Sequence, residues 1–129
     1  MGAFLMDTNA GIDLFDGLLP QKAAVWLDNH LVSGNIAISV INKIELLGFN
    51  MPPQAQQKMQ SLISLVEVLD LTDAIVNETI AIRKFKKIKL PDAIIAATAI
   101  VHNLTLISRN TVDFKNIGGL TCLDPYSDI

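Results

Sequence analysis

Five short apolar runs recur along the chain and are separated by longer segments with helical spacing. The runs cover residues 3–6, 36–38, 66–69, 104–107 and 121–123. Short apolar runs bounded by polar residues are typical of buried strands. Strands that alternate with helices predict a parallel sheet with helices on both faces. We therefore expect an α/β fold, a three-layer α/β/α sandwich around a central parallel sheet of about five strands.

Proline, serine and threonine mark the points where the intervening helices begin. Pro20, Pro53 and Pro91 each precede or open a helical pattern, and Ser39 and Thr72 are good N-capping residues. The expected helices cover residues 10–15, 21–31, 40–47, 54–64, 73–87 and 92–102. No connection needs more than about six residues, which is typical of a compact fold. Residues 1–129 are therefore expected to form a single domain.

Composition and charge exclude several classes of protein. With 50% hydrophobic and 18% charged residues, the chain has enough apolar material for a core, which excludes intrinsic disorder. A net charge of −3 argues against coating nucleic acid by bulk positive charge. The single cysteine excludes an internal disulfide framework. No apolar run approaches the roughly 20 residues of a membrane span, so we expect a soluble cytoplasmic protein without a membrane partner.

Four acidic residues are candidates for a common site: Asp7, Glu45, Asp92 and Asp113. Glu45 lies within the expected helix over residues 40–47, at the border of its apolar stripe, where a charge needs a partner. Asp7 and Asp113 follow the first and fourth predicted strands, and Asp92 opens an almost wholly apolar helix. The carboxyl ends of parallel strands meet at one edge, where ligands bind, so these acids are expected to lie close together. Each also has an ordinary structural explanation, as a turn residue, a helix-terminal acid or a surface acid.

Clustered carboxylates point to a divalent cation. Like charges held close together are unfavourable unless they are protonated or neutralised, and oxygen ligands suit Mg²⁺ or Mn²⁺. The chain offers no clustered histidines and cysteines for zinc. Polar support for such a site is expected from Asn9 and Ser39.

Half of the basic residues lie in one short segment. Residues 83–89 hold five of the ten lysines and arginines and lead directly into Leu90-Pro91-Asp92. A charge run is often only a solvated helix face. Beside an acidic metal site, however, positive charge favours contacts with phosphate groups. The residues expected to bind a phosphate backbone are Arg83, Lys84, Lys86, Lys87, Lys89 and Arg109.

Four segments, taken in order, resemble the PIN-domain ribonucleases, and among them the VapC-like toxins of type II toxin–antitoxin pairs. The resemblance covers nearly the whole chain. Its segments are residues 5–9, residues 38–48 with Glu45, residues 90–99 with Asp92, and residues 104–114 with Asp113.

The resemblance implies a metal-dependent endoribonuclease that hydrolyses RNA and leaves 3′-hydroxyl and 5′-phosphate ends. It implies that Asp7, Asp92 and Asp113 bind Mg²⁺ or Mn²⁺, and that Glu45 is a further ligand or acts through water as a general base. It also implies a homodimer and a small antitoxin protein as partner. The resemblance implies that Ser108 and Asn110 give polar support to the acids, and Asn110 stands where some relatives carry a further acid.

Two other interpretations remain open. The chain could be a catalytically inactive PIN fold that serves only as an interaction module, although all four acids are present. A receiver-like signalling domain would also bind Mg²⁺ at strand ends. That domain requires an acidic pair after the first strand and a lysine after the last, where this chain has Met6-Asp7 and Asp124-Pro125.

Overall fold

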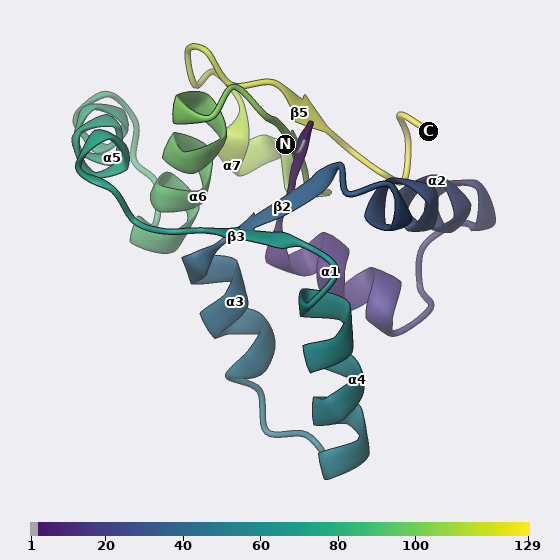
Figure 1. The fold of residues 1–129 in the computed structure, drawn as a ribbon. Helices are drawn as coiled ribbons and strands as arrows, with labels where there is room; N and C mark the ends of the chain where they lie inside the picture. Colours follow the sequence, from purple (N-terminus) through teal and green to yellow (C-terminus); the bar gives the residue numbers. More distant parts are fainter. Residues whose placement is uncertain (1–2) are drawn as a thin grey trace.

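Five parallel strands form the centre of the molecule (Figure 1). The computed structural model describes residues 3–129, so the first two residues of the predicted domain lie outside the described part. The strands are β1 (Phe4–Met6), β2 (Ile36–Ser39), β3 (Glu67–Leu69), β4 (Thr105–Ile107) and β5 (Cys122–Leu123). Their order across the sheet is β3-β2-β1-β4-β5, and every pairing is parallel. The predicted α/β class is confirmed.

Seven helices connect and cover these strands within residues 3–129. They are α1 (Thr8–Phe15), α2 (Gln21–Val32), α3 (Val40–Leu47), α4 (Pro53–Ile63), α5 (Asp73–Phe85), α6 (Leu90–Val101) and α7 (Thr111–Phe114). Several differ from the sequence-based expectation. Helix α1 begins two residues early because Asp7 caps it, and α6 also begins two residues early, at Leu90. Helix α5 ends at Phe85 because Lys86 adopts an extended conformation, and α2 and α4 differ from the expectation by one residue at their ends. Helix α7 has only four residues, too few for a periodic pattern.

Two hydrophobic clusters lie on opposite faces of the sheet. In β1, Leu5 belongs to the cluster with α5 and α6, whereas the next residue, Met6, belongs to the cluster with α1, α2 and α4. Successive strand residues point to opposite faces, so this alternation produces the three layers. The small residues of α6 are almost completely buried, which lets this helix pack closely on the sheet: Ala93, Ala96, Ala97 and Ala99.

The strand order determines where a site can form. The chain runs from β1 outward to β2 and β3, and later returns to the other side of β1 as β4. The strand order therefore reverses at β1 and β4, and in open parallel sheets ligands bind outside the carboxyl ends of the strands at such a point. Asp7 directly follows β1 there, and Ser108 directly follows β4. Within residues 3–129, no helix combines the length and apolarity that a membrane span requires.

The side chain of Asn42 links α3 to α1, and this link provides a test of the fold. Its side chain is completely buried, accepts a hydrogen bond from the Ser39 backbone N–H (2.8 Å) and donates one to the Thr8 hydroxyl (3.0 Å). We expect Asn42→Ala to lower the free energy of unfolding by about 2 kcal/mol, because a buried N–H loses its acceptor. Urea denaturation measures this value.

Lys43→Ala is the matched control, because Lys43 is the exposed neighbour of Asn42 in the same helix. We expect its free energy of unfolding to stay within about 0.5 kcal/mol of the wild type. Equal stability of Asn42→Ala and Lys43→Ala would show that the buried amide does not stabilise the fold.

Candidate functional site

Asp7 lies at the centre of the candidate site. Its side chain is 5% exposed, and it caps α1 with Oδ1 accepting the Thr8 backbone N–H (2.8 Å). Its Oδ2 accepts hydrogen bonds from the Ser108 hydroxyl (2.8 Å) and the Asn9 amide (3.1 Å). Burial raises the pKa of Asp7, the bonds from Ser108 and Thr8 oppose that rise, and the charges of Asp92 and Glu45 add to it. The carboxylate is therefore held rigidly but lacks nearby positive charge.

Glu45 is brought to the same edge by α3. This half-buried carboxylate accepts a hydrogen bond from the Thr8 hydroxyl (2.6 Å), which in turn accepts one from Asn42 (3.0 Å). Neither Thr8 nor Asn42 was predicted from the sequence as part of the site. A partial signal was present, because Asn42 follows the capping residue Ser39 at the spacing of a capping box. Glu45 is thus oriented through Thr8 by a buried amide.

Asp92 and Asp113 complete the acidic edge. Burial raises the pKa of Asp92, the charges of Asp113 and Glu45 raise it further, and Lys89 opposes the rise. Asp113 is exposed on α7, and its Oδ2 accepts a hydrogen bond from the Asn110 amide (2.9 Å). Asn110 also caps α7. The structure therefore brings all four predicted acids into one electrostatic environment.

The four acids do not converge tightly in this structure. Among residues 3–129, no three His, Cys, Asp or Glu side chains come close enough to form a metal-binding group. Glu45 and Asp113 are each hydrogen-bonded to a neighbouring side chain, Thr8 and Asn110. The chemistry of the donors nevertheless fits a hard divalent cation, because they are carboxylate oxygens whose mutual repulsion a cation would relieve.

The four predicted supporting residues have different roles. Ser108 is completely buried; its hydroxyl donates to Asp7 and accepts from the Asn9 amide (3.1 Å) and the Asn110 backbone N–H (3.0 Å). Asn9 and Asn110 therefore contact the site as expected. Ser39 does not contact the acids through a hydrogen bond, because its hydroxyl accepts the Ile41 backbone N–H and caps α3.

An ion pair between buried Asp13 and exposed Arg109, next to the site, was not predicted from the sequence. Asp13 is 2% exposed, and its Oδ2 accepts a hydrogen bond from the Tyr126 hydroxyl (2.9 Å) and lies 3.4 Å from the Arg109 guanidinium. The Arg109 backbone N–H donates to the Asn9 side chain (3.3 Å). Asn9 and Asp13 lie one turn apart on α1, so both fix the segment that follows β4. Arg109, expected to bind phosphate, is already engaged by Asp13.

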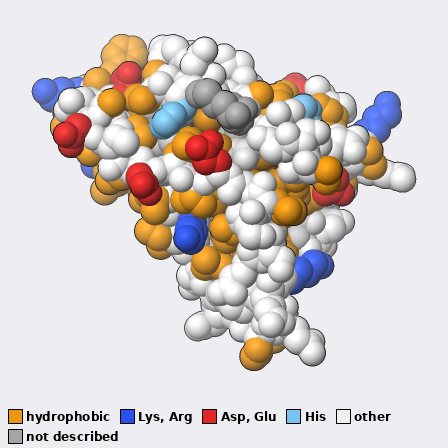
Figure 2. Space-filling view, in the orientation of Figure 1, with side chains coloured by type: hydrophobic (Ala, Val, Ile, Leu, Met, Phe, Trp, Pro, Cys, Tyr) orange, Lys and Arg blue, Asp and Glu red, His pale blue; other side chains and the backbone are white. Residues whose placement is uncertain are grey.

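The basic segment and one of the acids, Asp113, line the same cavity. Arg83, Lys87 and Lys89 line a cavity of about 400 Å³ together with Ile88 and Asp113. Lys86 differs from them, because its ammonium donates to the backbone carbonyls of Val112 and Lys115 and so ties the end of α5 to α7. On the face drawn in Figure 2, Lys and Arg side chains are scattered singly and form no continuous patch. The basic side chains of Arg83, Lys87 and Lys89 are instead gathered in the cavity beside Asp113.

Comparisons with known proteins show which family and which folds this chain is similar to. The sequence pattern of the PIN domain matches residues 4–120. A toxin–antitoxin complex from Klebsiella pneumoniae contains a chain that is 35% identical, with a TM-score of 0.76 over 95% of this chain and 97% of that one. DNA-bound VapBC from Salmonella typhimurium gives 26% identity and a TM-score of 0.84, over 97% and 99% of the two chains. A comparison with curated protein sequences gave no significant match.

VapBC2 from Rickettsia felis, bound to a DNA fragment from its promoter, is a third similar structure. Its identity to this chain is 26%, and its TM-score is 0.80 over 93% of this chain and 96% of that one. In all three comparisons, the similarity spans nearly the full length of this chain and of the matched chain. The fold and the order of its elements are therefore shared over the whole described chain.

The raised pKa of Asp92 gives a prediction about stability. Because burial and the neighbouring acids disfavour its charge, Asp92→Asn should stabilise the metal-free protein near pH 7. Solvent screening limits the gain to about 1 kcal/mol, or roughly 3 to 5 °C in melting temperature. Paired thermal melts in chelator measure the gain.

In Mg²⁺, the same melts should show a larger gain in stability for the wild type than for Asp92→Asn. A ligand at about 100 times its dissociation constant adds roughly 2.7 kcal/mol to stability, and the variant should lose most of that gain. An acid that only served the helix dipole would give another pattern. Asp92→Asn would then be less stable than the wild type in chelator and would keep the full Mg²⁺ shift.

Proposed function

This chain belongs to the PIN-domain family, and on that premise we propose that residues 1–129 form a single metal-dependent endoribonuclease domain. The observation that supports the proposal most directly is the edge of the sheet where Asp7, Glu45, Asp92 and Asp113 influence one another's charge. Such repulsion is costly to a fold, and it is useful where a divalent cation must bind. The reaction that we propose is hydrolysis of RNA phosphodiester bonds with Mg²⁺ or Mn²⁺, leaving 3′-hydroxyl and 5′-phosphate ends.

Each acid has a proposed role. Asp7, Asp92 and Asp113 would hold the cation, and Glu45 would be a fourth ligand or act as a general base through water. When bound, a divalent cation activates water for attack on phosphorus and stabilises negative charge on the scissile phosphate. Polar neighbours orient three of the carboxylates by hydrogen bonds, with Ser108 and Asn9 on Asp7, Thr8 on Glu45, and Asn110 on Asp113.

We propose further that the protein is the toxin of a toxin–antitoxin pair in the cytoplasm. The similar structures from Klebsiella pneumoniae and Salmonella typhimurium are toxin–antitoxin and VapBC complexes, which supports a small antitoxin protein as partner. The surface also carries exposed apolar side chains that a partner or a second copy would cover: Leu18, Val25 and Ile44. A homodimer is the assembly that we expect.

Removing one carboxylate charge tests the proposed ligands. We expect Asp7→Asn, Asp92→Asn and Asp113→Asn each to lower the rate of Mg²⁺-dependent RNA cleavage at least about 100-fold, because each keeps the shape of the side chain and removes a ligand charge. Glu45→Gln should be similarly impaired. Cleavage of a labelled single-stranded RNA is measured in Mg²⁺, in Mn²⁺ and in chelator.

Asp28→Asn is the control for this series, since Asp28 is an exposed acid on α2. It should cleave RNA at the wild-type rate. A variant of the series that cleaves RNA normally removes its residue from the site. Cleavage by the wild type that persists in chelator contradicts metal dependence, and absence of cleavage with either metal favours the inactive interaction module.

The basic residues beside Asp113 generate a separate prediction. Replacing Arg83, Lys87 and Lys89 by Ala should weaken RNA binding to a similar extent for every sequence, while RNA at saturating concentration is still cleaved. The slope of log K against log salt should become shallower by about one for each lost phosphate contact. Fluorescence anisotropy at several salt concentrations measures both effects.

Lys22→Ala and Lys58→Ala are charge-matched controls on α2 and α4, and they should leave the salt slope unchanged. An unchanged slope in the triple variant would show that this part of the basic segment is only a solvated surface.

A further inference from the structure

Phe85 is exposed to an extent that is unusual for an aromatic side chain. It is the last residue of α5 and is 80% exposed, more than any other aromatic residue in 3–129. The five-residue segment Arg83-Lys84-Phe85-Lys86-Lys87 places the ring among four cations. An apolar ring in water costs free energy, so its position within a basic segment requires an explanation.

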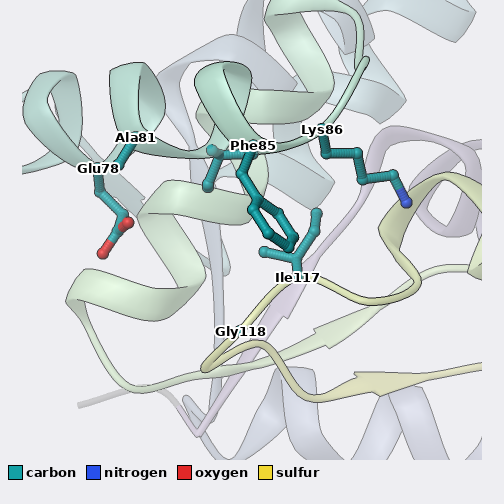
Figure 3. Close-up of a pocket in the computed structure, with 7 residues that line it drawn as sticks. Glu78, Ala81, Phe85, Lys86, Ile117 and Gly118 are labelled. Carbon is teal, nitrogen blue, oxygen red and sulfur yellow. The ribbon is translucent and has the colours of Figure 1, made fainter.

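The ring borders an apolar groove that suits a flat uncharged group. A hollow of about 260 Å³ is lined by Phe85, Ala81, Ile82, Ile117 and Gly118, with Glu78 and Lys86 at its borders. Figure 3 shows Phe85 extending from the end of α5 toward Ile117, which follows α7 in the chain. The Glu78 carboxylate disfavours a phosphate here. The Lys86 ammonium already donates to two backbone carbonyls, so it fixes the wall of the groove.

The groove continues toward the acids through two further hollows. The next, of about 290 Å³, shares Phe85 and Lys86 with the groove and adds Arg83, Lys84 and Lys87, together with Ile88. The third, of about 400 Å³, shares Arg83, Lys87 and Ile88 with the second and reaches Lys89 and Asp113. An aromatic groove, a basic hollow and a hollow that includes Asp113 are thus neighbours that share lining residues.

We propose that Phe85 is a base-stacking subsite for single-stranded RNA, an inference that rests on the proposed function and names the form of its substrate. An unpaired base stacks on the Phe85 ring within the groove, while neighbouring phosphates lie along Arg83, Lys84 and Lys87. Proteins bind single strands by this combination of aromatic stacking and positive charge. A paired base keeps its faces inside the duplex, so the subsite selects unpaired nucleotides. The apolar groove and the basic hollow beside it offer adjacent surfaces to a base and to its neighbouring phosphates.

The test measures binding in chelator, so that no hydrolysis occurs. The probe is a fluorescein-labelled single-stranded RNA of mixed sequence, and the proteins are wild type, Phe85→Ala, Phe85→Trp and Val32→Ala. Val32 is the control because it is 84% exposed on α2. Base–aromatic stacking is worth roughly 1 to 3 kcal/mol, so Phe85→Ala should weaken binding about tenfold, which corresponds to 1.4 kcal/mol. Phe85→Trp and Val32→Ala should bind like the wild type.

Two further measurements separate stacking from charge and from protein contacts. An oligomer of the same length without bases should bind equally to wild type and Phe85→Ala, and the salt slope of the variant should be unchanged. The proposal is overturned if Phe85→Ala binds RNA like the wild type, or if it loses as much affinity for the oligomer without bases. It is also overturned if sedimentation shows that Phe85→Ala lowers the oligomeric mass without changing RNA affinity, because Phe85 is then a protein contact.

Failure of the nuclease proposal is a different result. If the wild type does not cleave RNA in Mg²⁺ or Mn²⁺, the proposed activity is wrong, and the Phe85 effect on binding in chelator still stands. If the wild type cleaves RNA and Phe85→Ala binds normally, only the subsite is wrong.

Discussion

The burial of one carboxylate, that of Asp7, sets the arrangement of the whole candidate site. A buried carboxylate is costly unless hydrogen bonds replace its lost water. Asp7 accepts three hydrogen bonds, from the backbone of Thr8 and from the side chains of Asn9 and Ser108. Two of these donors belong to α1 and one follows β4, so satisfying the carboxylate fixes β1, α1 and β4 relative to one another at their shared edge.

The other acids are positioned by polar side chains that are connected to this centre. Ser108 accepts the backbone N–H of Asn110, whose side chain caps α7 and holds Asp113. Thr8, the first residue of α1, donates its hydroxyl to Glu45. Both carboxylates are therefore kept in place by neutral neighbours that do not cancel their charge. These supporting groups are hydroxyls and amides, so they do not neutralise the acids, whereas Lys89 is the cation that opposes the raised pKa of Asp92.

The sheet and the place of Asp7 could be predicted from the sequence because local rules decide them: apolar runs form the strands, and Asp7 directly follows the first one. The bond between Thr8 and Glu45 could not, because these residues are 37 positions apart and only the fold brings them together. The cap of α3 by Ser39 follows from a local rule and was predicted, although Ser39 makes no hydrogen bond to the acids. Residue type misled at Lys86, because its ammonium donates to two backbone carbonyls near the end of α7. The last carbonyls of a helix lack partners within it, and the sequence did not predict the four-residue helix α7 that supplies one of them.

The juxtaposition of cations and carboxylates explains how an acidic chain can approach a polyanion. The net charge of −3 opposes association at long range, whereas residues 83–89 concentrate positive charge in one strip. Arg83 and Lys84 lie in the last turn of α5, where the helix dipole also favours cations, so the strip is compatible with a stable helix. The strip reaches Asp113, where the acidic edge begins. Under the proposed function, attraction by these side chains would carry a phosphate to the boundary of the acidic site, and binding within the site would require that the carboxylate charge be neutralised first.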